Sequence, residues 1–451
     1  MPRKIQTRDS LTVYFLILIL ITVFALWFKS LEIESNRQQA GITILSLGIV
    51  LLAAYVFSRI LKITKLPLIT GYIFAGIIAG PYITGFLSVD DVERFRLVDD
   101  LALSFIAFTA GGALHLQSLK KKSRIILFNV ALLTIVVFAI VYLFIISTGR
   151  YFDFINTLSS TNITVFAILL GVVSVARSPS SAIAIISECR ASGPFTETIL
   201  GVTVVMDILV IIFFTFAMTI GKIVINGSEA VYYTALTGLS LEILASILIG
   251  IVLGKGISIY IDKAGHDLPL FLLFLAFGVT RTSLWISDFT ETHFNIFLHL
   301  EPLLICMSTG FTVQNFGSGG KVFMESLDRM ALPIYVLFFS LAGASLNIES
   351  LIICWPLALS LVFVRAGSIF LATWTAGTIS RDPSIHKNNA WMAYLTQAGV
   401  AIGLAQLAQR QFPEIGSYLT TVVLAVISIN QVVGPITFKA ALNIVKETGR
   451  D

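Results

Sequence analysis

Cysteine and histidine are scarce in this sequence of 451 residues. Its three cysteines, Cys189, Cys306 and Cys354, show no C-x-x-C spacing. Its five histidines show no metal-ligand spacing either; His293 and His299, for example, lie on different faces of a helix. We therefore expect no disulfide framework and no resident metal site, and we interpret the cysteines as small buried residues.

Common arrangements of catalytic residues are also absent. The sequence contains no H-E-x-x-H run and no cysteine–histidine pairing, and its serine cluster at Ser178, Ser180 and Ser181 has no histidine nearby to act as a base. The sequence therefore favours a protein that is not an enzyme and needs no cofactor.

Charged residues make up only 12% of the chain, while 56% is hydrophobic and the mean hydropathy is +0.91. This composition is typical of a polytopic membrane protein, in which about 20 apolar residues span the bilayer. We predict an all-α fold with about fourteen transmembrane helices. They are expected near 11–28, 40–60, 67–87, 98–116, 124–148, 162–188, 197–220, 230–254, 267–286, 293–313, 331–347, 351–377, 390–408 and 414–437.

The basic residues are distributed unevenly between the loops. Alternate loops and both termini hold twenty of the 30 lysines and arginines, and the opposite loops hold seven. Because cytoplasmic loops carry the excess of positive charge, this bias places both termini in the cytoplasm. The remaining three, Arg177, Arg281 and Arg365, fall inside hydrophobic segments.

A short repeat divides the chain into halves. AGGALHLQSL (Ala110 to Leu119) and AGASLNIESL (Ala342 to Leu351) align without a gap at an offset of 232, with five identities in ten. The offset spans seven predicted helices, so the two copies would have opposite orientations in the membrane. This pattern indicates an inverted-topology repeat, although two helix ends can also resemble each other by chance.

Matching positions in the two halves carry signs of interrupted helices. SVARSPSSAIAII (Ser174 to Ile186) has Pro179 in mid-span, and AYLTQAGVAIGLAQ (Ala393 to Gln406) has Gln397 and Gly399 there. Unwound backbone in a membrane is tolerated where it is buried in protein or lines a cavity. The alternative for the first segment is an ordinary proline kink satisfied by its serine hydroxyls.

Asp207 lies in mid-span on the helix that follows the first interruption. A carboxylate at the bilayer centre costs roughly 2.5–3.5 kcal/mol, which indicates a functional role. Its oxygens can hold a proton or an alkali cation, a transient metal ion, but not both at full strength. Hydroxyls of Ser178, Ser180, Ser181 and Thr203 could complete the cation's oxygen shell. The alternative is a static ion pair of Asp207 with Arg365 or Arg177.

Three segments in series resemble the monovalent cation–proton antiporters. LPLITGYIFAGIIAGP (Leu66 to Pro81) is similar to their first glycine–proline motif, and FFSLAGASLNIESL (Phe338 to Leu351) is similar to a helix of their second half. SPSSAIAIISECRASGPFTETILGVTVVMDILVI (Ser178 to Ile211) resembles their unwound helix and acidic helix.

The resemblance implies two crossed broken helices, a mobile core domain, a dimer-forming domain and an elevator-like motion. It also implies that Arg365 neutralises the acidic helix or the empty site. By position, the domains would be 1–39 as an extra helix and loop, 40–120 and 263–350 as the dimer domain, 121–222 and 351–451 as the core domain with a short tail, and 223–262 as the linker helix.

Two residues depart from the family's pattern. Met206 precedes Asp207 where relatives have a carboxylate or asparagine, and Arg177 stands where some relatives have the threonine of a Thr-Asp-Pro sequence. Arg177 could pair with Asp207 when no cation is bound, or it could fill the site permanently. Glu242, Arg281 and Glu301 are interpreted as structural pairs or as the lining of a funnel.

The function expected is an antiporter in a plasma (bacterial inner) membrane that exchanges protons for Na⁺, K⁺ or Li⁺, one for one and without net charge movement. It would be a homodimer in the lipid bilayer with no nucleic-acid partner. The alternative is a sensor or channel-like protein on the same fold, which Arg177 and Met206 favour.

Overall fold

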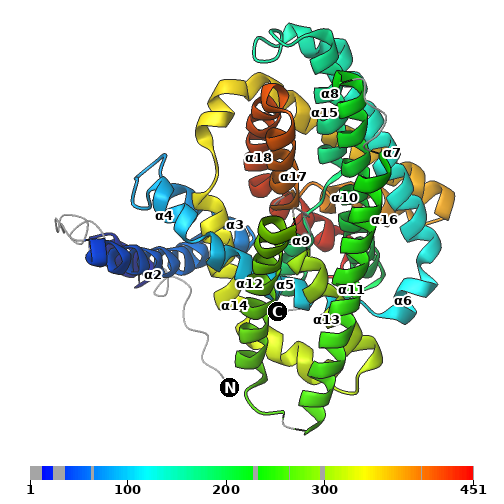
Figure 1. Cartoon of the computed structure of the whole chain (residues 1–451). Coiled ribbons are helices and arrows are strands. Elements are labelled where there is room, and N and C mark those ends of the chain that lie inside the picture. The colour runs from blue at the N-terminus through cyan, green and yellow to red at the C-terminus, as the bar shows by residue number, and fades with distance from the viewer. Residues whose placement is uncertain are drawn as a thin grey trace. The chain divides into compact units, whose positions relative to one another are not determined.

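The computed structural model describes residues 13–23, 36–61, 66–226, 232–263, 265–294, 300–397 and 399–449, and within those ranges the regular structure is helical (Figure 1). After the apolar helix Val13–Val23, the elements are α2 (Asn36–Leu61), α3 (Leu68–Ala79), α4 (Val89–Arg94), α5 (Arg96–Ala113), α6 (Leu116–Lys121), α7 (Ser123–Thr148), η2 (Gly149–Tyr151), α8 (Ser160–Val175), α9 (Pro179–Glu188), α10 (Pro194–Asn226), α11 (Tyr232–Lys263), α12 (Leu268–Phe294), α13 (Pro302–Phe316), α14 (Gly320–Ala344), α15 (Ile348–Ser380), α16 (Ser384–Asn389), η3 (Ala390–Ala393), α17 (Gly399–Gln411) and α18 (Pro413–Val445).

Every hydrophobic stretch identified in the sequence overlaps a described helix, which confirms the all-α fold class. Parts of the stretches 11–28, 230–254, 293–313 and 390–408 lie outside the described residues. Among the described residues, nine helical segments are long and apolar enough to cross a bilayer, and three shorter helices are apolar. The chain is therefore an integral multi-pass membrane protein, and the number of fourteen crossings stays a prediction.

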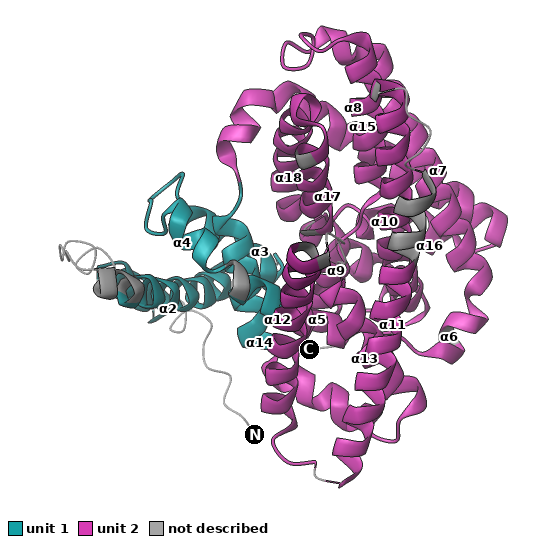
Figure 2. Cartoon of the chain, viewed as in Figure 1, with its two compact units in different colours: residues 1–102, 331–346 teal, residues 103–330, 347–451 magenta. Residues whose placement is uncertain are grey.

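The chain divides into two compact units (Figure 2), each described by itself. The smaller comprises residues 1–102 and 331–346, and a cluster of its buried apolar side chains joins α2, the α3–α5 region and α14; its members are Val50, Leu87, Phe95, Leu341 and Ala344. The larger comprises residues 103–330 and 347–451. In it α15 packs along α7 and α18, α8 lies against α7 and α10, and α11 packs on α13 (Figure 1). The assignment of helices to a core and a dimer domain stays a prediction.

Glycines of the repeated sequence lie at close helix contacts in both units. In the larger unit, a Cβ on Gly111 of α5 would collide with the backbone of Met307 on α13. In the smaller unit, a Cβ on Gly343 of α14 would collide with the backbone of Ile73 on α3. Gly111 and Gly343 are equivalent in the sequence repeat, so each copy of the repeat brings one helix close to a helix of the other half. A Cβ on Gly76 of α3 would likewise collide with the backbone of Ser340 on α14, so this glycine also permits close helix packing.

Candidate ion-binding site

The first interrupted helix is formed by α8 and α9, with the break at Ala176 to Ser178. Pro179 has no backbone N–H and occupies the first position of α9, where that donor would have no helical partner. Ser178 is the N-cap of α9, and its Oγ accepts the N–H of Ser181 at 3.2 Å. Proline and serine therefore end one helix and start the next within a single membrane segment.

The second interrupted helix consists of η3 and α17, with non-helical residues between them. The two breaks are hydrogen-bonded to each other. The N–H of Ser178 donates to the carbonyl of Thr396 at 3.2 Å, and Nε2 of Gln397 donates to the carbonyl of Val173 at 3.2 Å. Nδ2 of Asn430 on α18 in turn donates to Oε1 of Gln397 at 2.9 Å. Gln397 therefore fixes the crossing, while Gly399 begins the second half-helix.

Arg365 of α15 binds both breaks at once and is only 1% exposed. Its Nε donates to the carbonyl of Ser174 at 2.9 Å and Nη2 to that of Ala176 at 3.1 Å. On the other break, Nη1 donates to the carbonyl of Leu395 at 2.8 Å and Nη2 also reaches that of Tyr394 at 3.4 Å. These carbonyls lie where helices end, so they lack helical donors and form the negative ends of helix dipoles. The guanidinium neutralises backbone charge at the crossing.

Arg177 lies in the first break and is 2% exposed. Its Nη1 makes only long contacts to the carbonyls of Ser174 and Ala176, at 3.4 and 3.5 Å. Its Nε and Nη2 are buried with no hydrogen-bond partner, as is the hydroxyl of Tyr394. Among the described residues, neither Arg177 nor Arg365 forms an ion pair with a carboxylate. The alternative of a static pair with Asp207 therefore has no support in this conformation.

The predicted hydroxyl ligands are engaged in helix capping and backbone bonds. The Oγ of Ser178 lies 2.9 Å from that of Ser181 and 3.1 Å from that of Ser180. Thr203 is buried and donates to the carbonyl of Ile199 at 2.8 Å. Each hydroxyl oxygen retains lone pairs, but none of these residues lines the pocket that contains Asp207.

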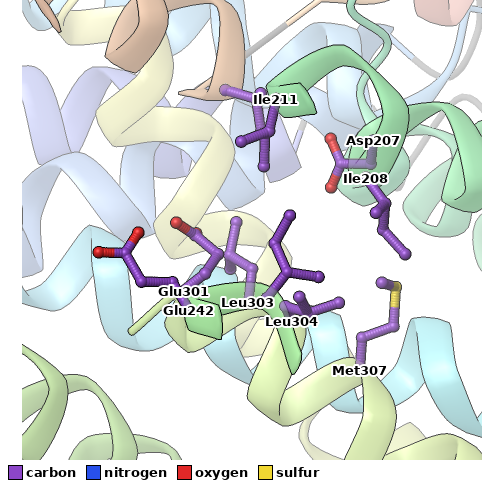
Figure 3. A pocket seen from close by; sticks show the side chains of 10 residues that line it. Asp207, Ile208, Ile211, Glu242, Glu301, Leu303, Leu304 and Met307 are labelled. Atoms are coloured by element: carbon purple, nitrogen blue, oxygen red, sulfur yellow. The ribbon is translucent and has the colours of Figure 1, made fainter. Parts of the chain in front are cut away.

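Asp207 faces a mostly apolar pocket of about 80 Å³ (Figure 3). It points in from α10, and Glu242 of α11 and Glu301 at the start of α13 approach from the opposite side. The other lining residues are Ile208, Ile211, Ile243, Leu303, Leu304, Met307 and Val400. Oδ1 of Asp207 is buried and has no hydrogen-bond partner. An acceptor of this kind is ready to receive a proton or a cation.

The gathering of three carboxylates around one pocket was only partly predictable. Glu242 and Glu301 were expected to form pairs or line a funnel, and the structure places both on the wall of the pocket opposite Asp207. Nothing in the sequence spacing links them to Asp207, because they come from separate helices. Among the described residues no three of His, Cys, Asp and Glu could hold one metal ion together, so the carboxylates surround the pocket rather than converge.

Comparison with known proteins agrees with this fold. The sequence model of the family described as "Sodium/hydrogen exchanger, transmembrane" matches residues 47–444. Two solved structures of the sodium proton antiporter MjNhaP1 from Methanocaldococcus jannaschii are similar in fold at 18% sequence identity. One, determined at pH 8, has a TM-score of 0.64 and covers 91% of this chain and 100% of the other. The second, an electron-microscopy map, has a TM-score of 0.65 and covers 92% and 100%. No curated protein matches the sequence.

The chain therefore belongs to the sodium/hydrogen exchanger family of membrane transporters, whose activity is cation–proton antiport. It is a transporter and not an enzyme.

Proposed function

We propose that the protein exchanges one Na⁺ or K⁺ for one proton at Asp207. The observation that carries the proposal is the buried, unpartnered Oδ1 of this carboxylate, on the helix next to the crossed breaks. A proton and a cation compete for the same oxygens, so loading one releases the other. Ser178, Ser180, Ser181 and Thr203, together with carbonyls at the breaks, complete the cation's shell when the half-helices shift.

The acidic pocket supports the approach of a cation. Glu242 and Glu301 bring negative charge to the wall facing Asp207, and no basic residue is among those that line the pocket. Clefts lined by charge of one sign raise the local concentration of the opposite ion. By resemblance, Asp207 belongs to the moving core, while Glu242 and Glu301 belong to the linker helix and the dimer domain. An elevator-like motion then separates Asp207 from the two glutamates. The proposed protein is a homodimer in the plasma membrane, with both termini in the cytoplasm.

The experiment that tests the site is Asp207→Asn. Asparagine keeps the size of the side chain but cannot exchange a proton for a cation, so we expect the variant to fold and to show no exchange. Cation-induced dequenching of a pH dye in proteoliposomes measures the activity, and Asp288→Asn, at an exposed carboxylate of α12, is the matched control. Exchange by Asp207→Asn at the rate of the unmodified protein would falsify the proposal.

The second candidate function is a sensor or channel-like protein without coupled exchange. It is favoured by Arg177, whose buried guanidinium brings a positive charge close to the crossing, and by Met206 beside Asp207. The same liposomes separate the two functions. A sensor gives no cation-driven proton flux, and a channel gives flux of one ion without the other.

A further inference from the structure

The chain after α18 folds back onto the connection between α9 and α10. The carboxylate of Glu447 accepts the N–H of Phe195 on Oε1 at 2.7 Å. Its Oε2 accepts both the N–H and the Oγ1 hydroxyl of Thr196, each at 2.7 Å. The side chain of Glu447 therefore accepts two backbone N–H groups in the first turn of α10, the helix that carries Asp207.

The backbone and one ion pair reinforce this contact. The N–H of Ser192 donates to the carbonyl of Glu447 at 3.0 Å, and the N–H of Gly449 donates to the carbonyl of Cys189 at 3.0 Å. Nζ of Lys439 on α18 lies 3.6 Å from Oε1 of Glu188, the last residue of α9. We call residues 446–449, docked on residues 189–196, the C-terminal clasp.

The α9–α10 connection is built for this contact. α10 follows Gly193, which has no side chain to cap the helix and has a φ of 153°, a conformation that L-residues with a Cβ rarely adopt. A Cβ at this position would also collide with the carboxylate of Glu447. The free N–H groups at the start of a helix favour an anionic acceptor. For α10 this acceptor is Glu447, which lies 252 residues after Phe195 in the sequence.

We propose that Glu447 is a positioning residue for exchange, because its clasp holds α9, α10 and α18 together as one body. α9 begins at the first break and α10 carries Asp207, so the clasp sets how the carboxylate is aligned with the oxygens at the break. This inference rests on the proposed function of Asp207. A cation needs several oxygens in place at once, whereas a proton needs only one. Loosening the clasp therefore weakens cation binding more than it slows the exchange of a saturated site.

Cation titrations of the full-length protein in proteoliposomes test the proposal. We expect Glu447→Ala to raise the apparent KM for Na⁺ or K⁺ by roughly three- to tenfold, equivalent to about 0.7–1.4 kcal/mol, with the maximal rate per folded protein nearly unchanged. Glu447→Gln keeps one acceptor oxygen, so its apparent KM should lie between those of the unmodified protein and of Glu447→Ala. It replaces the alanine variant in the test if that variant does not fold. Glu325→Gln is the matched control, since Glu325 is exposed on α14 with only a 3.9 Å contact to Lys321.

Hydrogen–deuterium exchange provides a second measurement that does not depend on transport. The amides of Phe195 and Thr196 should lose protection in Glu447→Ala and keep it in Glu325→Gln. Unchanged protection would show that Glu447 does not hold α10. Lost protection with an unchanged KM would assign the clasp to stability alone, and either result overturns the inference. Exchange by Asp207→Asn contradicts the proposed site instead, so the two failures are distinguishable.

Discussion

Arg177 and Arg365 are both buried at the crossing, yet their guanidinium groups are bound very differently. Arg365 donates to four carbonyls, while Arg177 makes two long contacts and leaves Nε and Nη2 without acceptors. An unsatisfied buried donor costs about 1–3 kcal/mol, and more when it is charged. Of the two arginines, Arg177 therefore gains more by changing partner, and the anionic form of Asp207 is a suitable one.

We expect Arg177→Gln to shift the pH optimum of exchange upward. If the guanidinium reaches Asp207 when no cation is bound, its charge favours release of the proton. Two unit charges at 4 Å interact by about 4 kcal/mol at an effective dielectric constant of 20, and 1.4 kcal/mol corresponds to a factor of ten. Without that charge the proton leaves only at higher pH. Rates of dye dequenching measured from pH 6 to pH 9 give the profile.

The control for this variant is Arg124→Gln, which removes an exposed arginine at the start of α7. Its exchange rate should depend on pH in the same way as that of the unmodified protein. A profile that is equally unchanged in Arg177→Gln would mean that Arg177 only packs against the helix end and never reaches the carboxylate.

At the scale of elements, the crossing of the two interrupted helices depends on the guanidinium of Arg365, which bridges two helix ends. Arg365→Lys tests this, because a single ammonium group cannot span the carbonyls of Ser174 and Leu395 together as the planar guanidinium does. At least one break loses its donor, which costs about 1–3 kcal/mol per carbonyl left unsatisfied. We expect a lower thermal unfolding midpoint in detergent and reduced exchange.

Arg281→Lys is the matched control, since Arg281 is exposed on α12. It should leave the unfolding midpoint within error of the unmodified protein. An Arg365→Lys variant that is equally stable would show that the breaks do not need a bidentate donor.

The sequence predicted the interrupted elements because the residues that interrupt them act locally. Pro179 removes a backbone donor at its own position, and Gly399, a poor helix former, stands where the second half-helix begins. The partners of these elements depend on long-range contacts. Three such contacts bring together residues that are far apart in the chain: Arg365 with its carbonyl acceptors, Asp207 with the carboxylates that face it, and Glu447 with the start of α10. No spacing rule in the sequence could have found them.

For the whole molecule, the pocket determines how much charge one transport cycle can move. Asp207 on α10 is the one pocket carboxylate that the proposed motion carries with the core, whereas Glu242 and Glu301 remain with α11 and α13. A single mobile carboxylate holds one proton in one direction and one monovalent cation in the other. The loaded core then carries the same net charge in both directions, although the glutamates still attract cations to it.

We therefore expect electroneutral exchange. Recordings on a solid-supported membrane should show little steady current, and the exchange rate in proteoliposomes should change little when a potassium–valinomycin potential is imposed. Moving one elementary charge through 100 mV is equivalent to about 2.3 kcal/mol, so a cycle that carried net charge would respond strongly. Na⁺ is the substrate in these measurements, and the same K⁺ gradient without valinomycin is the control for K⁺ that acts as a substrate.

Glu301→Gln distinguishes the two possible roles of the second carboxylate. If Glu301 only attracts the cation, its removal raises the apparent KM and leaves the rate insensitive to potential. If Glu301 instead carries a second proton, the unmodified protein shows a rate that follows the potential, and Glu301→Gln removes that dependence. A potential-dependent rate in the unmodified protein that Glu301→Gln abolishes would contradict one-for-one exchange and assign the extra proton to α13.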